Sequence, residues 1–217
     1  MFVRDYMTKH PVLVEPTMST VEAQGIMAET NIRHLPVVET GKRLVGLVTR
    51  ERLRIPAASL SSLNVWEITR FLSNLAVKDV MVKGRDVITI GPDATLEAAA
   101  ETMARHKIGC LPVVEEGIIT GILTEVDLLV QLAGLLGAGV SGVRVTIRVP
   151  DRLGEFAKIT SAIASKGWGI YASGGLPTPK QPETWDIVIK VRLAPQEELI
   201  DVLQSIEGHQ VIDVRET

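Results

Sequence analysis

Apolar and polar positions in the first 135 residues follow one pattern that is used twice. In each copy a short β-rich run precedes a proline turn, and a segment with apolar residues at helical spacing comes next. Two more β-rich runs then flank a turn, and a closing helix begins at Thr49 or Thr124. The predicted strands are residues 12–14, 35–38 and 44–48 in the first copy, and 87–90, 111–114 and 118–123 in the second.

The two copies also match residue by residue. The run Val3-Arg4-Asp5-Tyr6-Met7 returns as Val77-Lys78-Asp79-Val80-Met81, and Leu-Pro-Val-Val-Glu occurs at residues 35–39 and 111–115. A β-α-β-β-α unit of this size buries only one face of its small sheet, so a second copy is expected to cover the first. We therefore predict a pseudo-twofold pair of repeats, one in residues 1–56 and the other in residues 77–133.

Different patterns occur between and after the copies. Residues 57–76 are expected to form a packed connector, since residues 59–76 read as a helix with Leu63, Trp66, Ile68, Leu72 and Leu75 as its apolar residues. The glycines of residues 134–142 break helical propensity and predict a linker. Both segments mark boundaries between more regular parts of the chain.

The last part of the chain, residues 143–217, predicts a separate domain. Strands are expected at residues 143–149, 168–172, 185–191 and 210–214, with helices after Gly154 and from Pro195, and a polar loop over residues 174–184. The order β-α-β-β-α-β is the ferredoxin-like arrangement. The expected fold class of the whole chain is therefore mixed α/β (α+β).

Composition narrows the classes of partner. The chain has 46% hydrophobic and 23% charged residues, as is ordinary for a soluble globular protein, and a net charge of −3. That charge gives no sign of a nucleic-acid or anionic-membrane partner. The single cysteine, Cys110, cannot form an internal disulfide, and the chain has neither a signal-peptide run nor a stretch of ~20 apolar residues. We expect a cytoplasmic protein.

The two copies resemble CBS domains, and the pair resembles a Bateman module. The resemblance rests on the segments at residues 32–37 and 108–113, which contain Leu-Pro-Val, and on Gly-x-x-Thr before each closing helix. Residues 143–217 look like an ACT domain through Val149-Pro150-Asp151-Arg152-Leu153-Gly154. The order of the three domains is similar to that of the acetoin-utilisation accessory (AcuB-like) proteins.

The CBS resemblance implies a site for an adenine nucleotide of the AMP, ADP or ATP class. In nucleotide-binding CBS domains, Thr/Ser-x-x-Asp places a hydroxyl against the phosphate and a carboxylate against the ribose; here the motif is Thr124-x-x-Asp127. The first copy has Arg52 in place of the acid, and Glu51 is one position off, so we expect one ribose site, in the second copy. The resemblance places the other contacts at Val87, Ile88, Thr89, Gly109, Cys110, Leu111 and Pro112, with Arg33 and His34 at the phosphate.

Each of these residues also has an ordinary structural interpretation. Thr124 and Asp127 would serve equally well as a helix cap, with an acid in the first turn favoured by the helix macrodipole. Arg33 and His34 would suit a solvated pair that faces a partner, and Cys110 would pack as a small apolar residue.

The ACT resemblance implies a ligand loop at Asp151, Arg152, Leu153 and Gly154, where a glycine lets a ligand carboxylate approach the start of a helix. ACT domains that bind amino acids often carry Asn after the glycine of the second strand, and Ile170 follows Gly169 here. We therefore expect no response to amino acids and a role in dimerisation.

Three functions fit these patterns. The first is a non-catalytic regulatory protein, a homodimer, that senses an adenine nucleotide without a required cofactor and acts through its ACT domain on a partner such as a regulated enzyme. The second is a structural adaptor with vestigial ligand sites. The third is an enzyme, which the sequence disfavours because it has no nucleophile–base pair, metal constellation or Walker-type loop.

Overall fold

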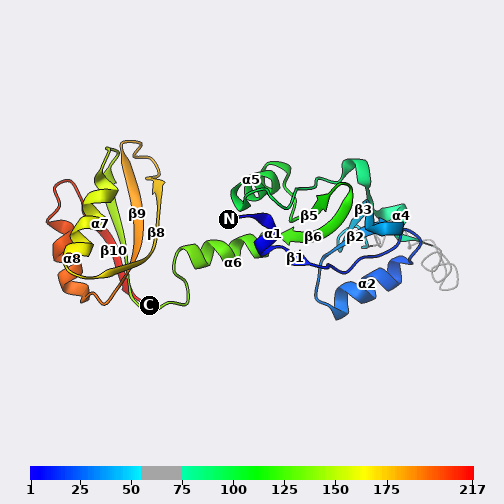
Figure 1. Cartoon of the computed structure of the whole chain (residues 1–217), viewed down its shortest axis with the longest axis horizontal. Coiled ribbons are helices and arrows are strands. Elements are labelled where there is room, and N and C mark those ends of the chain that lie inside the picture. Colours follow the sequence, from blue (N-terminus) through cyan, green and yellow to red (C-terminus); the bar gives the residue numbers. More distant parts are fainter. Residues whose placement is uncertain (55–74) are drawn as a thin grey trace, which may run out of the picture. The chain divides into compact units, whose positions relative to one another are not determined.

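The computed structural model describes residues 1–54 and 75–217, which form two compact units, Met1–Leu128 and Leu129–Thr217 (Figure 1). Helix α6 (Glu125–Leu135) begins in the first unit and ends in the second. The connector helix expected for residues 59–76 lies outside the described residues except at its last two positions, where Ala76 forms a bridge with Ser19.

The first unit is built from an antiparallel sheet and helices. Strands β2 and β3 form one antiparallel hairpin, β5 and β6 form the other, and the two hairpins meet where Arg43 pairs with Ile118. Two short 3₁₀ turns lie at η1 (Thr40–Lys42) and η3 (Gly84–Asp86). The other elements are α1 (Val3–Tyr6), β1 (Thr8–Lys9), α2 (Thr20–Glu29), β2 (His34–Glu39), β3 (Arg43–Thr49), α4 (Val77–Val80), β4 (Val82–Lys83), α5 (Leu96–His106), β5 (Cys110–Glu115) and β6 (Ile118–Thr124).

The two copies exchange their leading segments. Strand β1 of the first copy pairs with β6 of the second, and β4 of the second copy pairs with β3 of the first. Val3 is fully buried in the core that contains Leu96 and Leu111, whereas Val77 is fully buried beside Met27. Each core is therefore completed by residues from the other copy, and neither copy is a whole folded unit when read along the sequence.

The exchange depends on the glycine of each Gly-x-x-Thr segment. Gly46 lies on β3 under β4, and a Cβ at this position would lie 2.8 Å from the carbonyl oxygen of Val82. Gly121 lies on β6 under β1, and a Cβ there would lie 3.0 Å from the carbonyl oxygen of Thr8. A larger residue would push the exchanged strand off the hairpin, so backbone approach explains the glycine in both copies.

Three predicted elements of the first unit differ from the structure. The strands expected at residues 12–14 and 87–90 are single bridges, Val14 with Val37 and Ile90 with Val113. A proline two residues later in each copy has no N–H to extend the ladder. The closing helix expected from Thr49 begins as a turn in which the Leu53 N–H donates to the Thr49 carbonyl, and residues 55–74 lie outside the described part.

The second unit has the expected order β-α-β-β-α-β. Its strands form an antiparallel sheet in the order β10-β7-β9-β8, and apolar residues of both helices pack on one face of it (Figure 1). Strand β8 continues to Pro177, which pairs with Trp185, so the predicted loop over residues 174–184 is shorter than expected because the ladder with β9 extends into it. The elements are β7 (Val143–Pro150), α7 (Glu155–Ser165), β8 (Gly169–Pro177), β9 (Thr184–Arg192), α8 (Gln196–Gln204) and β10 (Gln210–Glu216).

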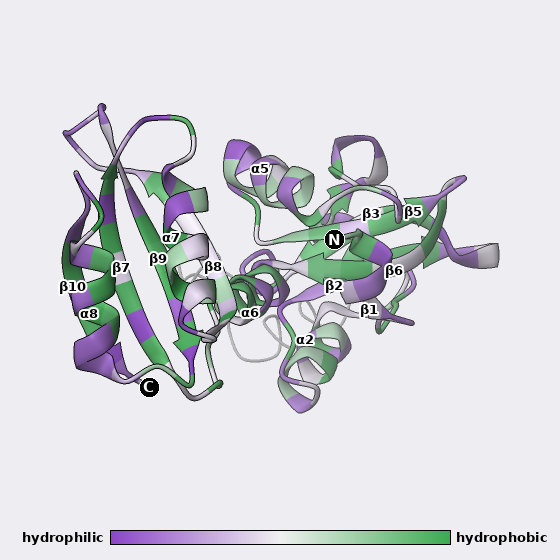
Figure 2. Cartoon of the chain, turned by 60° about the vertical axis from the view of Figure 1, so that its left-hand side comes forward, coloured by the Kyte–Doolittle hydropathy of each residue, from purple (hydrophilic) through white to green (hydrophobic). Residues whose placement is uncertain are grey.

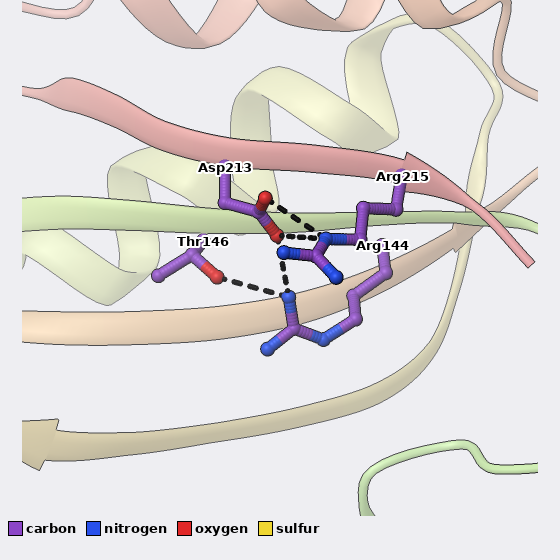
Figure 3. A network of polar contacts seen from close by, with 4 residues as sticks. All are labelled: Arg144, Thr146, Asp213 and Arg215. Atoms are coloured by element: carbon purple, nitrogen blue, oxygen red, sulfur yellow. Dashed lines mark hydrogen bonds and ion pairs between the residues drawn. The ribbon is translucent and has the colours of Figure 1, made fainter.

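The other face of this sheet is polar. Apolar residues of β7 are buried at every second position, and the residues between them are half-buried. The hydropathy colours alternate along β7 (Figure 2). On the polar face, Arg144 Nη1 donates to Asp213 Oδ2 at 3.0 Å and to Thr146 Oγ1 at 3.2 Å (Figure 3). Arg215 Nε donates to both carboxylate oxygens of Asp213 at 3.0 Å. The alternation of β7 thus separates the helix-covered core from a network of ion pairs.

Candidate functional site

A cleft of about 670 Å³ in the first unit is lined by residues of both copies. The ends of the two hairpins and the segment after β4 contribute to its walls. The lining residues are Arg33, His34, Leu47, Thr49, Arg50, Glu51, Arg52 and Arg54 from the first copy, and Val82, Asp86, Val87, Ile88, Lys107, Ile108, Gly109, Cys110 and Glu125 from the second.

Most of the positive charge in the cleft comes from the first copy. That copy supplies four arginines and one acid, Glu51, whereas the second copy supplies Lys107, Asp86 and Glu125. The cleft therefore carries an excess of cations in a chain whose net charge is −3. A concave site with this balance attracts anions, and guanidinium groups match the geometry of phosphate in particular.

The arginines differ in how much they are already used. Arg50 Nη2 donates to the Ile32 carbonyl at 2.9 Å and so binds the end of α2. Arg52 Nη1 has only a long contact of 3.4 Å to the Val80 carbonyl. Within residues 1–54 and 75–217, the Arg33 guanidinium has no hydrogen-bond partner. Within those residues, the donors of the Arg33 guanidinium are therefore available for a ligand phosphate.

His34 lies beside Arg33 at the start of β2. Burial lowers the pKa of His34 from 6.5, and the charge of Arg33 lowers it further, while Glu125 and Glu51 act in the opposite direction. The imidazole is therefore neutral at neutral pH. An anion bound nearby would favour its protonated form.

Gly109 separates His34 from Glu125. The backbone N–H of Glu125 donates to the Gly109 carbonyl at 3.1 Å. A Cβ at Gly109 would lie 3.3 Å from Glu125 Oε2 and 3.6 Å from His34 Cε1. The absence of a side chain at Gly109 thus lets an imidazole and a carboxylate approach the same point from different copies.

Cys110 is buried beside Leu47 and Ile122. Burial raises the pKa of the Cys110 thiol to about 12, and the nearby charge of Glu125 contributes. The side chain is therefore an uncharged thiol that packs as a small apolar residue, which is the ordinary interpretation considered from the sequence.

The structure separates the predicted nucleotide residues into two groups. Arg33, His34, Val87, Ile88, Gly109 and Cys110 line the cleft, whereas Thr89, Leu111, Pro112, Thr124 and Asp127 do not. Leu111 is fully buried in the core of the second copy. Arg52, which occupies the position of Asp127 in the first copy, does line the cleft.

Thr124 and Asp127 bind each other. Asp127 Oδ2 accepts from the Thr124 N–H at 2.8 Å and from Thr124 Oγ1 at 2.7 Å, and the Asp127 N–H donates to Thr124 Oγ1 at 3.3 Å. This is the helix-cap arrangement at the start of α6. Both bonds to the carboxylate use Oδ2, and within the described residues Oδ1 keeps its capacity to accept from a ligand hydroxyl.

Sequence reasoning missed several residues that line the cleft. Glu125 directly follows Thr124, but it is neither the Thr nor the Asp of the Thr-x-x-Asp motif. Lys107 also lines the cleft; it caps the end of α5 in the left-handed conformation, with φ of 54°. Asp86, Arg50 and Arg54 also line the cleft. The sequence does contain a signal for two of these residues. A charged residue directly follows the threonine of Gly-x-x-Thr in each copy, Arg50 after Thr49 and Glu125 after Thr124.

The predicted ACT ligand loop lies in the second unit. Asp151, Arg152 and Leu153 are exposed, and Gly154 has φ of 89° before α7. The next residue, Glu155, is buried; it accepts from Lys158 Nζ at 2.9 Å and lies 2.7 Å from His209 Nε2. The hydrogen bonds from Lys158 and then His209 lower the pKa of Glu155. No pattern in the sequence predicted this buried pair.

Within residues 1–54 and 75–217, no three His, Cys, Asp or Glu side chains gather closely enough to hold a metal ion. Among the helices of the same residues, none combines the length and apolar character needed to cross a membrane.

Comparison with protein families matches residues 3–55 and 77–134 to the CBS domain. Among curated proteins, an inosine-5'-monophosphate dehydrogenase of Korarchaeum cryptofilum is 37% identical over 123 residues, which are 56% of this chain and 22% of the enzyme. The chain thus spans about a fifth of the length of the enzyme relatives that it matches.

Three solved structures resemble the same part of the chain. A protein from Vibrio cholerae named as an acetoin utilization protein (AcuB) has 33% identity and a TM-score of 0.53, with coverage of 63% of this chain and 93% of that one. The CBS domain pair of protein MJ0100, bound to 5'-methylthioadenosine and S-adenosyl-L-methionine, has 27% identity, a TM-score of 0.51 and coverage of 62% and 97%. CBSX2 of Arabidopsis thaliana, bound to AMP, has 26% identity, a TM-score of 0.51 and coverage of 61% and 96%.

Proposed function

The chain belongs to the CBS domain family, and on that premise we propose that it is a non-catalytic regulatory protein that binds an adenine nucleotide in the cleft between its two copies. The observation that carries the proposal is the cleft of about 670 Å³ with its excess of cations, in which the Arg33 guanidinium has no hydrogen-bond partner among the described residues. This volume lies within the ~300–1,000 Å³ of typical small-molecule sites. The similar CBS pairs that hold AMP or S-adenosyl ligands support an adenosine compound.

The charge of the cleft favours a phosphorylated nucleotide over an S-adenosyl compound. Arg33 and Arg52 offer guanidinium donors that pair with phosphate oxygens, and neutral His34 becomes a further cation when an anion binds. S-adenosylmethionine carries a sulfonium cation where the nucleotide has its phosphate, and its methionine part offers these groups only one carboxylate, balanced by an ammonium group. We therefore expect AMP, ADP or ATP to bind more tightly than S-adenosylmethionine.

The C-terminal unit is proposed to be an ACT domain that transmits the bound state to a partner. Helix α6 supplies Glu125 to the cleft, and Gly137, with φ of 77°, follows shortly after the helix ends at Leu135. The Ala138 N–H donates to the Ala133 carbonyl at 2.9 Å, as in a Schellman motif. Lys190 of β9, only 4% exposed, donates from Nζ to the Gly137 carbonyl at 2.9 Å. Helix α6 therefore begins with a residue of the cleft, and the backbone just after its end is hydrogen-bonded to a buried lysine of β9.

The apolar surface of α6 supports a homodimer. Every residue of α6 is described and none is buried, although the helix is apolar over most of its circumference (Figure 2). Its exposed apolar residues are Val126, Leu129, Val130, Leu132 and Leu135. Helices that are apolar on most sides are normally covered, and a second copy of the chain would cover this one. Light scattering that gives a monomer at micromolar concentration would contradict the dimer.

Calorimetric titration and thermal unfolding of the full chain with AMP, ADP and ATP test nucleotide binding. At 100 times the dissociation constant, a ligand stabilises the folded state by about 2.7 kcal/mol, which is several degrees in melting temperature for a chain of this size. Arg33→Ala should weaken binding about ten- to a hundredfold, because it removes a charge-assisted hydrogen bond worth ~1.5–3 kcal/mol. Arg105→Ala, which removes an exposed arginine outside the cleft, is the matched control.

The outcome separates the proposed function from its main alternative. Binding of at least one nucleotide that depends on Arg33 supports a sensor. If millimolar concentrations of all three nucleotides leave the melting temperature unchanged, the cleft is vestigial and the chain is a structural adaptor. Turnover of a bound nucleotide would identify an enzyme. Mass spectrometry of small molecules that copurify with the protein would identify the ligand directly.

A further inference from the structure

The sheet of the second unit has one face that the helices do not cover, and this face is cationic. Strands β7, β9 and β10 alternate between residues that pack in the core and residues that point away from it. The charged residues that point away from the core are five cations and two acids, although the net charge of the whole chain is −3. They are Arg144, Arg148, Asp186, Lys190, Arg192, Asp213 and Arg215.

Three of these cations form a row across the sheet. Arg215 pairs with Arg144 in the ladder between β10 and β7, and Arg144 pairs with Lys190 in the ladder between β7 and β9. Like charges directly opposite each other on one face destabilise a sheet. The row therefore does not stabilise the fold by itself, and an anion bound over it would remove the repulsion.

Two arginines of the row share one carboxylate. Arg144 Nη1 donates to Asp213 Oδ2, and Arg215 Nε donates to both oxygens of the same carboxylate (Figure 3). The side chains of Arg144 and Arg215 are 35% and 69% exposed. A second carboxylate that approached from solvent could therefore pair with guanidinium groups that a single aspartate only half neutralises.

The third cation of the row connects the face to helix α6. Lys190 is only 4% exposed and donates from Nζ to the Gly137 carbonyl at 2.9 Å, just after α6 ends. The first residue of α6, Glu125, lines the nucleotide cleft. A partner bound over the row would thus lie beside the residue that holds the end of a helix from the cleft.

The form of the face favours a protein over a small molecule or a nucleic acid. These side chains lie on an open sheet, whereas small-molecule sites are concave. Sheets that bind single-stranded nucleic acid present aromatic side chains on which bases stack. The one aromatic residue of β7, β9 and β10 is Trp185, and it packs against the core on the other face.

We propose that this cationic face, centred on Arg144 and Arg215, is a docking surface for an acidic segment of a partner protein. The carboxylates of that segment pair with the two guanidinium groups that share Asp213. The inference rests on the proposed function, in which the second unit acts on a partner, and it specifies the chemistry of that partner.

Fluorescence anisotropy of a labelled polyglutamate peptide, titrated with the full-length protein, tests the surface. At an ionic strength of about 0.01 M, where screening is weak, the wild-type protein should bind the peptide. The double variant Arg144→Ala/Arg215→Ala should bind about tenfold more weakly, because two partly exposed ion pairs are lost. Arg215→Ala alone changes a 69% exposed side chain, so it should keep the wild-type melting temperature and show part of the same loss.

The control variant is matched in charge. Arg105→Ala/Arg152→Ala also removes two exposed arginines, but neither lies on the cationic face. It should bind the peptide nearly as tightly as the wild-type protein. Equal losses in the two double variants would mean that only net charge attracts the peptide, and the docking surface would be wrong.

Other outcomes also overturn the surface. If excess AMP or Arg33→Ala abolishes peptide binding, the peptide occupies the nucleotide cleft. If a labelled oligouridylate binds more tightly than the peptide and depends on Arg144 and Arg215, the face binds nucleic acid. If the wild-type protein binds AMP but not the peptide, the surface is wrong and nucleotide sensing stands. If it binds the peptide through these arginines but no nucleotide, the surface stands and the sensor is wrong.

Discussion

Alanine substitutions at Gly46 and Gly121 give a matched pair that connects the exchange of leading segments to the cleft. Each glycine lies under an exchanged strand, and the added Cβ would meet the thioether of Met81 or Met7. The methionine can rotate away at small cost. The strand carbonyls cannot: they would lie 2.8 Å from the Cβ in Gly46→Ala and 3.0 Å from it in Gly121→Ala. The strand must therefore move in both variants.

The expected loss of stability is similar in the two variants. Overpacking of this kind costs about 1–3 kcal/mol, partly offset by ~0.4–1 kcal/mol because alanine restricts the unfolded chain. At ~2–4 °C per kcal/mol, the melting temperature should fall by several degrees. Strand β4 pairs with β3 at only two positions, Gly46 with Lys83 and Leu47 with Val82, so few hydrogen bonds hold it in place.

The two variants should differ in nucleotide binding. Val82 of β4 lines the cleft, whereas neither residue of β1 does. Gly46→Ala should therefore weaken AMP binding in calorimetric titration, and Gly121→Ala should leave it close to the wild-type value. Thermal unfolding followed by circular dichroism measures the stability of the same samples.

Two results would refute this reasoning. If both variants have the melting temperature of the wild-type protein, the leading segments do not lie against these glycines. If both lose nucleotide affinity equally, the effect comes from general destabilisation and the position of β4 is not a determinant of the cleft.

Three further predictions concern titratable groups. Since burial holds the pKa of His34 below 6.5 and a bound phosphate favours imidazolium, nucleotide binding should take up a proton; the affinity ratio of wild type to His34→Gln should rise as pH falls from about 8 to about 6 in parallel titrations. With the pKa of its thiol raised to about 12, Cys110 should resist iodoacetamide in the native protein at about pH 8 and react after unfolding, as read by mass spectrometry; rapid native labelling would contradict its burial. The pKa of Glu155 is lowered, so its contribution to stability is complete above its ordinary value of 4.5 and is lost as pH falls through the folded-state pKa. Glu155→Gln should therefore cost about 1–3 kcal/mol at neutral pH in denaturant unfolding, and the difference should vanish in acid; an unchanged difference in acid would show that charge is not its cause.

The sequence alone determined the features that depend on local pattern. The repeat of Leu-Pro-Val and Gly-x-x-Thr predicted the two hairpins, and the alternation of residues 143–149 predicted the first strand of the second unit. Helices α2 and α5 begin at capping side chains, Ser19 and Thr95, which accept from the N–H groups of Glu22 and Ala98. These features follow from short-range periodicity and hydrogen bonding, which a chain carries within a few residues.

Only the tertiary structure decided which residues share the cleft. The pairing of β4 with β3 and of β1 with β6 joins residues from different copies, and nothing in the local sequence of residues 8–9 or 82–83 specifies a partner. The same long-range packing brings Arg33 and Glu125 into one cleft. It also decides how the motif residues are used, because the Asp127 carboxylate binds Thr124 at the helix start and leaves the neighbouring Glu125 facing the cleft. The periodicity of the sequence determines which side of a helix or strand is apolar. Which other element covers that side depends on how the elements pack together in three dimensions.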